Sequence, residues 1–231
     1  MNLLKSNSST TAIILFAKSE EIESAAKLIA PSAKQNLLLW KKMNDMVLKT
    51  IQKTKLPYFI SNETNQVGTT FGEKITHSIQ EIFAKGFQNV IIVGNDCIEL
   101  KAKHLLNAAQ NLQTNNCVLG ADYNGGVYLI GVSKSGFNTG QFESIQWQTK
   151  NVFSALQTLY QKQAIVYLPI LADCNSTSDF KKTLHQLPYF SRLKKILLSF
   201  LFVPKHQNKI ETNSIVSQYY AASFNKGSPF Q

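Results

Sequence analysis

The polar and apolar positions of this chain alternate between short apolar runs and longer amphipathic stretches. The short runs are rich in β-branched residues and predict buried strands, whereas apolar residues that recur every three or four positions predict helices. The predicted strands are 11–17, 56–61, 90–93, 117–120, 127–131 and 164–169. The predicted helices are 20–30, 32–54, 73–85, 101–113, 151–161 and 177–186. This order predicts a three-layer α/β/α domain with a mainly parallel sheet, to which 127–131 adds an antiparallel strand.

The pattern changes after Pro188, so we expect one α/β domain over 1–187 and a C-terminal extension over 188–231. The segment 189–203 is aromatic, basic and aliphatic, and the chain beyond it is polar. We therefore expect an extension that is partly helical and then loosely ordered. The stretch 193–203 is expected to pack against the chain's own core. Peripheral contact with a membrane surface or a partner is the alternative interpretation.

The formal net charge of +10 comes almost entirely from lysine, since Arg192 is the only arginine. Proteins that read nucleic acid rely on arginine for bidentate contacts to bases and phosphates. The lysines are also scattered along the chain. We therefore expect no nucleic-acid partner, although a positive field remains compatible with an anionic small ligand.

The three cysteines show no CxxC spacing, which favours a reduced, intracellular chain without a disulfide framework. A polar stretch interrupts the apolar character of the first residues, so no signal peptide is predicted. The longest apolar run, 196–203, is too short to span a membrane. These features together predict a cytoplasmic protein.

Asp96 is the strongest single candidate for a catalytic or metal-binding residue, because it follows the strand-like run 89–93 and the pair Gly94-Asn95. Ligands of open α/β sheets bind at the carboxyl ends of the strands. A carboxylate there suits a hard divalent cation such as Mg²⁺ or Mn²⁺, which it would share with substrate phosphates. The alternative is that Asp96 caps the next helix or stabilises a turn.

Two further segments end predicted strands in the same way. Asp122, Asn124, Gly125 and Gly126 form a turn whose glycines permit close backbone approach to a ligand, but such a turn is also common between strands. Asp173 offers a second carboxylate for a metal, although its neighbours could simply cap a helix. Trp147 could fill core or form the wall of a sugar pocket. The sequence contains no histidine pair, Walker loop or GxGxxG motif.

Six elements in this order resemble those of the DUF2064 family, the glycosyltransferase-like proteins also called selenodomain-associated transferase 1. That family lies in the GT-A, nucleotide-diphospho-sugar transferase superfamily. The resemblance covers residues from about 11 to 180. The matching elements are 15–18 (LFAK), 71–74 (FGEK), 94–98 (GNDCI), 120–131 (GADYNGGVYLIG), 146–149 (QWQT) and 173–180 (DCNSTSDF).

The resemblance implies a GT-A-like fold and a metal-assisted transferase that acts on a nucleotide or nucleotide-sugar and an unknown acceptor. Asp96 and Asp122 would be catalytic, and Asp96 and Asp173 would bind Mg²⁺ or Mn²⁺. The substrate-binding residues would be Lys18, Lys27, Asn95, Asn124, Gly125, Gly126 and Trp147.

The chain departs from the family pattern where phosphate is expected to bind. Glutamates occupy positions 20, 21 and 23, where the family has basic residues, and Asn124 and Asn175 replace acidic ones. Carboxylates beside a diphosphate repel it. A catalytically inactive binding or scaffold protein is therefore the main alternative, and a nucleotidyltransferase is a third.

Overall fold

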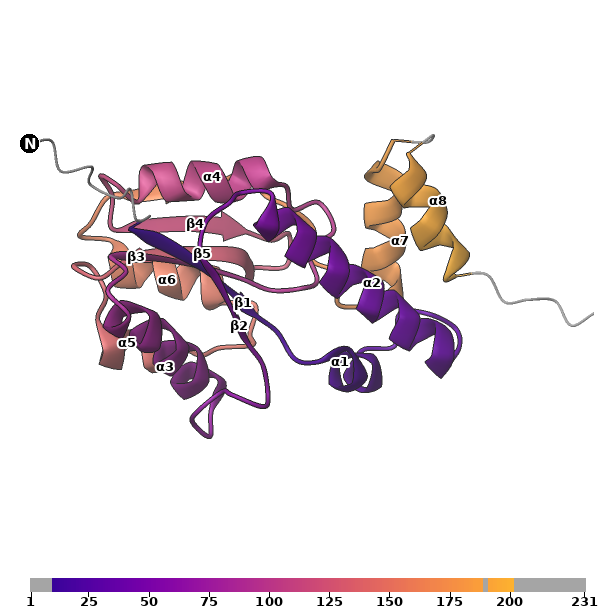
Figure 1. Cartoon of the computed structure of the whole chain (residues 1–231), viewed down its shortest axis with the longest axis horizontal. Helices are drawn as coiled ribbons and strands as arrows, with labels where there is room; N and C mark the ends of the chain where they lie inside the picture. The colour runs from indigo at the N-terminus through magenta and orange to yellow at the C-terminus, as the bar shows by residue number, and fades with distance from the viewer. Residues whose placement is uncertain (1–9, 189–190, 202–231) are drawn as a thin grey trace, which may run out of the picture.

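The computed structural model describes residues 10–188 and 191–201 and centres on a six-stranded sheet with the order β2-β1-β3-β5-β4-β6 (Figure 1). All neighbouring strands are parallel except β5, which runs antiparallel to both β3 and β4. The predicted antiparallel addition is thus confirmed. The strands are β1 (Thr11–Phe16), β2 (Tyr58–Ser61), β3 (Asn89–Val93), β4 (Cys117–Ala121), β5 (Val127–Ser133) and β6 (Ile165–Tyr167).

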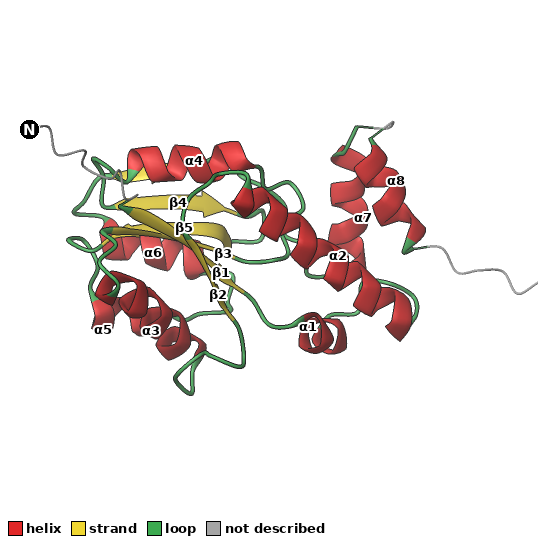
Figure 2. Ribbon diagram, viewed as in Figure 1, coloured by secondary structure: helices red, strands yellow, loops and turns green. Residues whose placement is uncertain are grey.

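Helices cover both faces of the sheet, which confirms the three-layer α/β/α prediction (Figure 2). The C-terminal half of α2 and α4 pack on one face, and α3, α5 and α6 pack on the other. The short helix α5 was not predicted. The helices are α1 (Glu20–Ala26), α2 (Ala33–Gln52), α3 (Phe71–Ala84), α4 (Ala102–Asn111), α5 (Thr139–Glu143), α6 (Val152–Tyr160), α7 (Thr177–Gln186) and α8 (Arg192–Ser199).

Burial of both sheet faces explains the apolar runs. In β3, Ile91 and Val93 belong to the core under α2 and α4, whereas Val90 and Ile92 belong to the core over α3 and α6. A strand buried on both faces needs apolar side chains at every position, so its sequence does not alternate.

The helices α7 and α8 form a third apolar cluster with the N-terminal half of α2, at one end of the molecule in Figure 1. Leu197 of α8 is fully buried there, and Leu193 packs against the cluster. The described part of 193–203 thus packs against the chain's own core, as expected. Residues 202 and 203, and the polar tail predicted to be loosely ordered, lie outside the described residues. In the part of the chain that the structure describes, no helix is both long and apolar enough to cross a membrane.

Candidate functional site

Asp96, Asp122 and Asp173 come from three different loops at the carboxyl edge of the sheet. The segment after β6 runs alongside the end of β4, where Leu171 bridges to Asp122. It then reaches the loop after β3, where the Cys174 amide donates to the Asp96 carbonyl at 2.9 Å. Sequence positions far apart are thereby brought into one acidic cluster, as the strand ends predicted.

Asp173 lies at the centre of this cluster and is only 7% exposed. Burial and the nearby charges of Asp96 and Asp122 raise the pKa of its carboxyl group well above the usual range. A hydrogen bond with the Asp122 carboxylate also favours its protonated form. Among the described residues, Oδ1 of Asp173 has no hydrogen-bond partner. Buried polar atoms rarely lack one, so a partner from outside the chain would complete this position.

The side chain of Asp122 organises the turn that follows it. Its Oδ1 accepts hydrogen bonds from the amides of Asn124 at 2.6 Å and Gly126 at 2.8 Å. Gly125 has a φ of 86°, and a Cβ there would clash with the carbonyl oxygen of Lys150. Gly125 is therefore required by the turn itself, and backbone contact of Gly125 and Gly126 with a ligand remains a prediction. The side chain of Asn124 is exposed.

Lys27 brings a positive charge to the cluster. Its Nζ lies 3.0 Å from Oδ2 of Asp96 and 3.6 Å from Oε2 of Glu23. Burial lowers the pKa of this lysine, but the charges of Asp96 and Glu23 outweigh burial, so the pKa is raised overall. The ammonium group therefore stays charged and is shared by two carboxylates.

Asn36 determines where Lys27 lies. This fully buried side chain accepts from the amides of Ile29 and Ala30 and donates to the carbonyls of Ser24 and Lys27. These four bonds satisfy backbone groups that a longer helix would have paired. As a result α1 ends at Ala26, earlier than the predicted 20–30, and Lys27 takes an extended conformation.

Two of the three glutamates at the start of α1, Glu20 and Glu23, contact residues of this site, whereas Glu21 is exposed. Glu23 is buried against Lys27, and Glu20 accepts from Asn44, which in turn accepts from Asn95 at 2.7 Å. Asn95 therefore connects the loop after β3 to α2. The contributions of Glu23 and Asn44 were not predicted, although Glu20, Glu23 and Lys27 have the spacing of one helix face.

Two of the predicted substrate-binding residues, Lys18 and Trp147, have surroundings other than the aspartate cluster. Lys18 is exposed. Hydrogen bonds from Ser19 lower the pKa of the neighbouring Glu63 carboxyl group, and the charge of Lys18 adds only a small part of this effect. Trp147 packs between Phe71 and Phe142 in the core, and its indole nitrogen donates to the Phe142 carbonyl at 3.1 Å. Neither residue contacts the aspartate cluster in the interactions that the structure shows.

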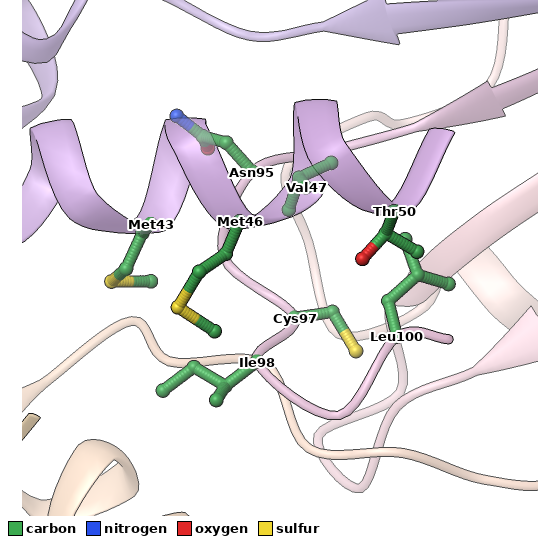
Figure 3. A pocket seen from close by; sticks show the side chains of 8 residues that line it. All are labelled: Met43, Met46, Val47, Thr50, Asn95, Cys97, Ile98 and Leu100. Carbon is green, nitrogen blue, oxygen red and sulfur yellow. The ribbon is translucent and has the colours of Figure 1, made fainter. Parts of the chain in front are cut away.

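A pocket of about 20 Å³ lies between α2 and the loop after β3 (Figure 3). It can take a water molecule but not a nucleotide. Its lining is mostly apolar and consists of Met43, Met46, Val47, Thr50, Asn95, Cys97, Ile98 and Leu100.

The residues present do not fit a divalent metal ion as they are arranged. A hard cation needs several free oxygen ligands. However, Oδ2 of Asp96 is paired with Lys27, Oδ1 of Asp122 accepts two amides, and Asp173 favours its proton. Within residues 10–188 and 191–201, no group of three or more histidine, cysteine or acidic residues is placed to hold a metal.

Residues 42–149 match the family model of DUF2064, described as an uncharacterized protein conserved in bacteria. The resemblance to this family is confirmed over that segment. A comparison with proteins of curated function finds no match.

Solved structures support the fold. A "putative nucleotide-diphospho-sugar transferase" from Desulfovibrio desulfuricans G20 superposes with a TM-score of 0.75 at 20% identity, covering 83% of this chain and 94% of that one. The predicted GT-A-like fold is thus confirmed. Two more distant similarities are a homologue of Rv0371c from Mycobacterium sp. strain JC1 (TM-score 0.49, 9% identity, 83% and 98% covered) and Rv0371c of Mycobacterium tuberculosis H37Rv in complex with manganese (TM-score 0.43, 7% identity, 77% and 99% covered).

Proposed function

We propose that this protein is a GT-A-like transferase that binds a nucleotide-sugar at the carboxyl edge of its sheet. The observation that carries the proposal is the meeting of Asp96, Asp122 and Asp173 in one cluster, with Lys27 paired to Asp96. Burying several carboxyl groups together costs stability, because each loses its hydration and repels the others. Such clusters are found preferentially at functional sites, where pKa values are shifted for a purpose.

In the proposed reaction, the oxygen of an acceptor hydroxyl attacks the sugar carbon that carries the diphosphate. A bond forms between that oxygen and the carbon, the bond from the carbon to the diphosphate oxygen breaks, and the diphosphate leaves. Asp96 or Asp122 would accept the hydroxyl proton. Lys27 would offset phosphate charge in the aspartate cluster, and Lys18, which follows the end of β1, would offset it outside the cluster. Backbone groups of 124–126 would contact donor or acceptor.

A divalent metal is also implied by the resemblance, with Asp96 and Asp173 as its ligands. If bound, Mg²⁺ or Mn²⁺ would neutralise the leaving diphosphate. The proposed reaction contains no metal step, because the ion pair with Lys27 occupies the Asp96 carboxylate.

A second candidate is a binding protein of the same fold that does not turn over its ligand. Lys27 is already paired with both Asp96 and Glu23, and a diphosphate would have to compete with these two carboxylates for its ammonium group. This pairing favours the binding protein. Release of nucleoside diphosphate over time distinguishes the two: it accompanies transfer and is missing in a binding protein.

The test is calorimetric titration of the protein with UDP-, GDP-, ADP- and CDP-sugars and with nucleoside triphosphates. We expect saturable binding of one nucleotide, weakened at least roughly tenfold by Lys27→Met, as is typical for the loss of a charge-assisted contact. The matched control is Lys41→Met, which removes an exposed lysine of α2. Failure of every nucleotide to bind would contradict the proposal.

A further inference from the structure

We propose that Lys27 is a built-in cation that takes the place of a divalent metal at Asp96, so that the site needs no metal and gains a metal site only when this lysine is removed. This inference rests on the site of the proposed function, but it concerns only which cation the site holds. It can therefore be tested without a nucleotide.

Lys27 occupies the position that a metal ion at Asp96 would take. Nζ of Lys27 lies 3.0 Å from Oδ2 of Asp96 and 3.6 Å from Oε2 of Glu23, so it lies against both carboxylates. A divalent ion would need the same oxygens at roughly 2.0–2.6 Å. The ammonium and a metal ion cannot share this space, because their charges repel and their ligands coincide.

Several contacts hold Lys27 in place. Its backbone carbonyl accepts from Asn36 at 2.8 Å and from the Trp40 indole at 3.2 Å. Its Nζ lies 5.4 Å from the centroid of the Trp40 ring, within the range of a cation–π interaction. The side chain is only 28% exposed. Ordinary surface lysines have none of these constraints, so this ammonium is a fixed part of the site.

Without Lys27, the negative charge of the surrounding carboxylates would have no cation to balance it. Glu23 and Asp96 are 11% and 18% exposed at their side chains, and Asp173 lies close to Asp96. Removing the ammonium leaves carboxylate oxygens that face the same space with no cation. Hard divalent cations prefer such oxygen ligands. The variant is thus expected to bind the metal that the natural sequence excludes.

The experiment is titration with Mn²⁺ alone, followed by electron paramagnetic resonance of the free ion. The proteins are the wild type, Lys27→Met, Lys27→Met combined with Asp96→Asn, and the control Lys41→Met. We expect Lys27→Met to gain one Mn²⁺ site, at least roughly tenfold tighter than any site of the wild type, a difference typical of altered metal sites. The double variant should lose that site, and the control should resemble the wild type.

Two results would overturn the inference. One is binding of a single Mn²⁺ by the wild type that Asp96→Asn abolishes. The other is a folded Lys27→Met protein that gains no site. If Lys27→Met fails to fold, titrations of the wild type and of Asp96→Asn still show whether the natural protein binds Mn²⁺ through Asp96. Lys27→Gln then takes the place of Lys27→Met in the test for a gained site. Lack of nucleotide binding would affect only the proposed function, because no nucleotide is present here.

Discussion

Nζ of Lys27 and Oδ2 of Asp96 lie 3.0 Å apart and join the end of α1 to the loop after β3. The two residues are distant in sequence, and both are largely shielded from solvent. Their pairing places a positive charge inside the acidic cluster of Asp96, Asp122 and Asp173. It is therefore relevant to the stability of the fold as well as to the ligand that the site accepts.

Removing Lys27 should destabilise the protein. Lys27→Met leaves Asp96 and Glu23 without their shared cation, and we expect a loss of about 1–3 kcal/mol in the free energy of unfolding. Urea denaturation measures this loss. Lys41→Met, an exposed substitution on the same protein, should change stability by less than about 0.5 kcal/mol. Equal effects of the two substitutions would show that the ion pair contributes nothing.

The pH dependence of stability should reveal the buried Asp173. Because its pKa is raised in the folded protein, its contribution is fully present below the unfolded pKa of about 3.9 and is lost as pH rises toward the folded value. Asp173→Asn removes this titration. The stability of the variant relative to wild type should therefore increase between about pH 4 and pH 7.

Thermal unfolding of both proteins across this range measures the effect. Asp45→Asn serves as the control, because Asp45 is an exposed carboxylate on α2. A difference between Asp173→Asn and wild type that does not vary with pH would show that Asp173 is ionised in the folded protein.

Asn36 should be among the most sensitive polar positions. Asn36→Ala leaves the amides of Ile29 and Ala30 and the carbonyl of Ser24 without a partner, whereas the Lys27 carbonyl keeps its bond from the Trp40 indole. Each unpaired buried group costs about 1–3 kcal/mol, so a total loss of at least about 3 kcal/mol is expected. Urea denaturation tests this against Gln110→Ala, an exposed substitution on α4. A loss near that of the control would mean that water replaces all four bonds.

Two glycines with similar backbone angles should respond differently to alanine. Gly125 and Gly86 have φ values of 86° and 96°, but only a Cβ at Gly125 meets another atom, the Lys150 carbonyl oxygen. Gly86→Ala should cost about 1 kcal/mol, the usual penalty for a left-handed conformation. Gly125→Ala should cost at least about 1 kcal/mol more, because the turn must move. Equal unfolding free energies would show that the contact is readily relieved.

The sequence was most informative about the sheet. The run 90–93 is apolar at every position because β3 is buried on both faces, and the structure places the strand at Asn89–Val93. The clustering of the three aspartates also followed from strand order, because parallel strands end at the same edge. The helix α5 was missed because five residues carry too little periodicity to detect.

The partners of Lys27 could not be read from the sequence. The Lys27–Asp96 pair depends on the early end of α1, which the buried side chain of Asn36 determines. A single asparagine on the apolar face of α2 was the only local sign of this arrangement. The core position of Trp147 likewise depends on Phe71 and Phe142, whose proximity arises only in the folded chain.

Lys27 is proposed to supply the cation of a nucleotide-sugar site. The most direct measurement is calorimetric titration of wild type and Lys27→Met with the nucleotide-sugars, each with and without Mn²⁺. We predict that one nucleotide-sugar binds the wild type with the same affinity in both conditions and binds Lys27→Met much more weakly when Mn²⁺ is absent. Binding by the wild type only in the presence of Mn²⁺, or binding that does not depend on Lys27, would contradict this claim.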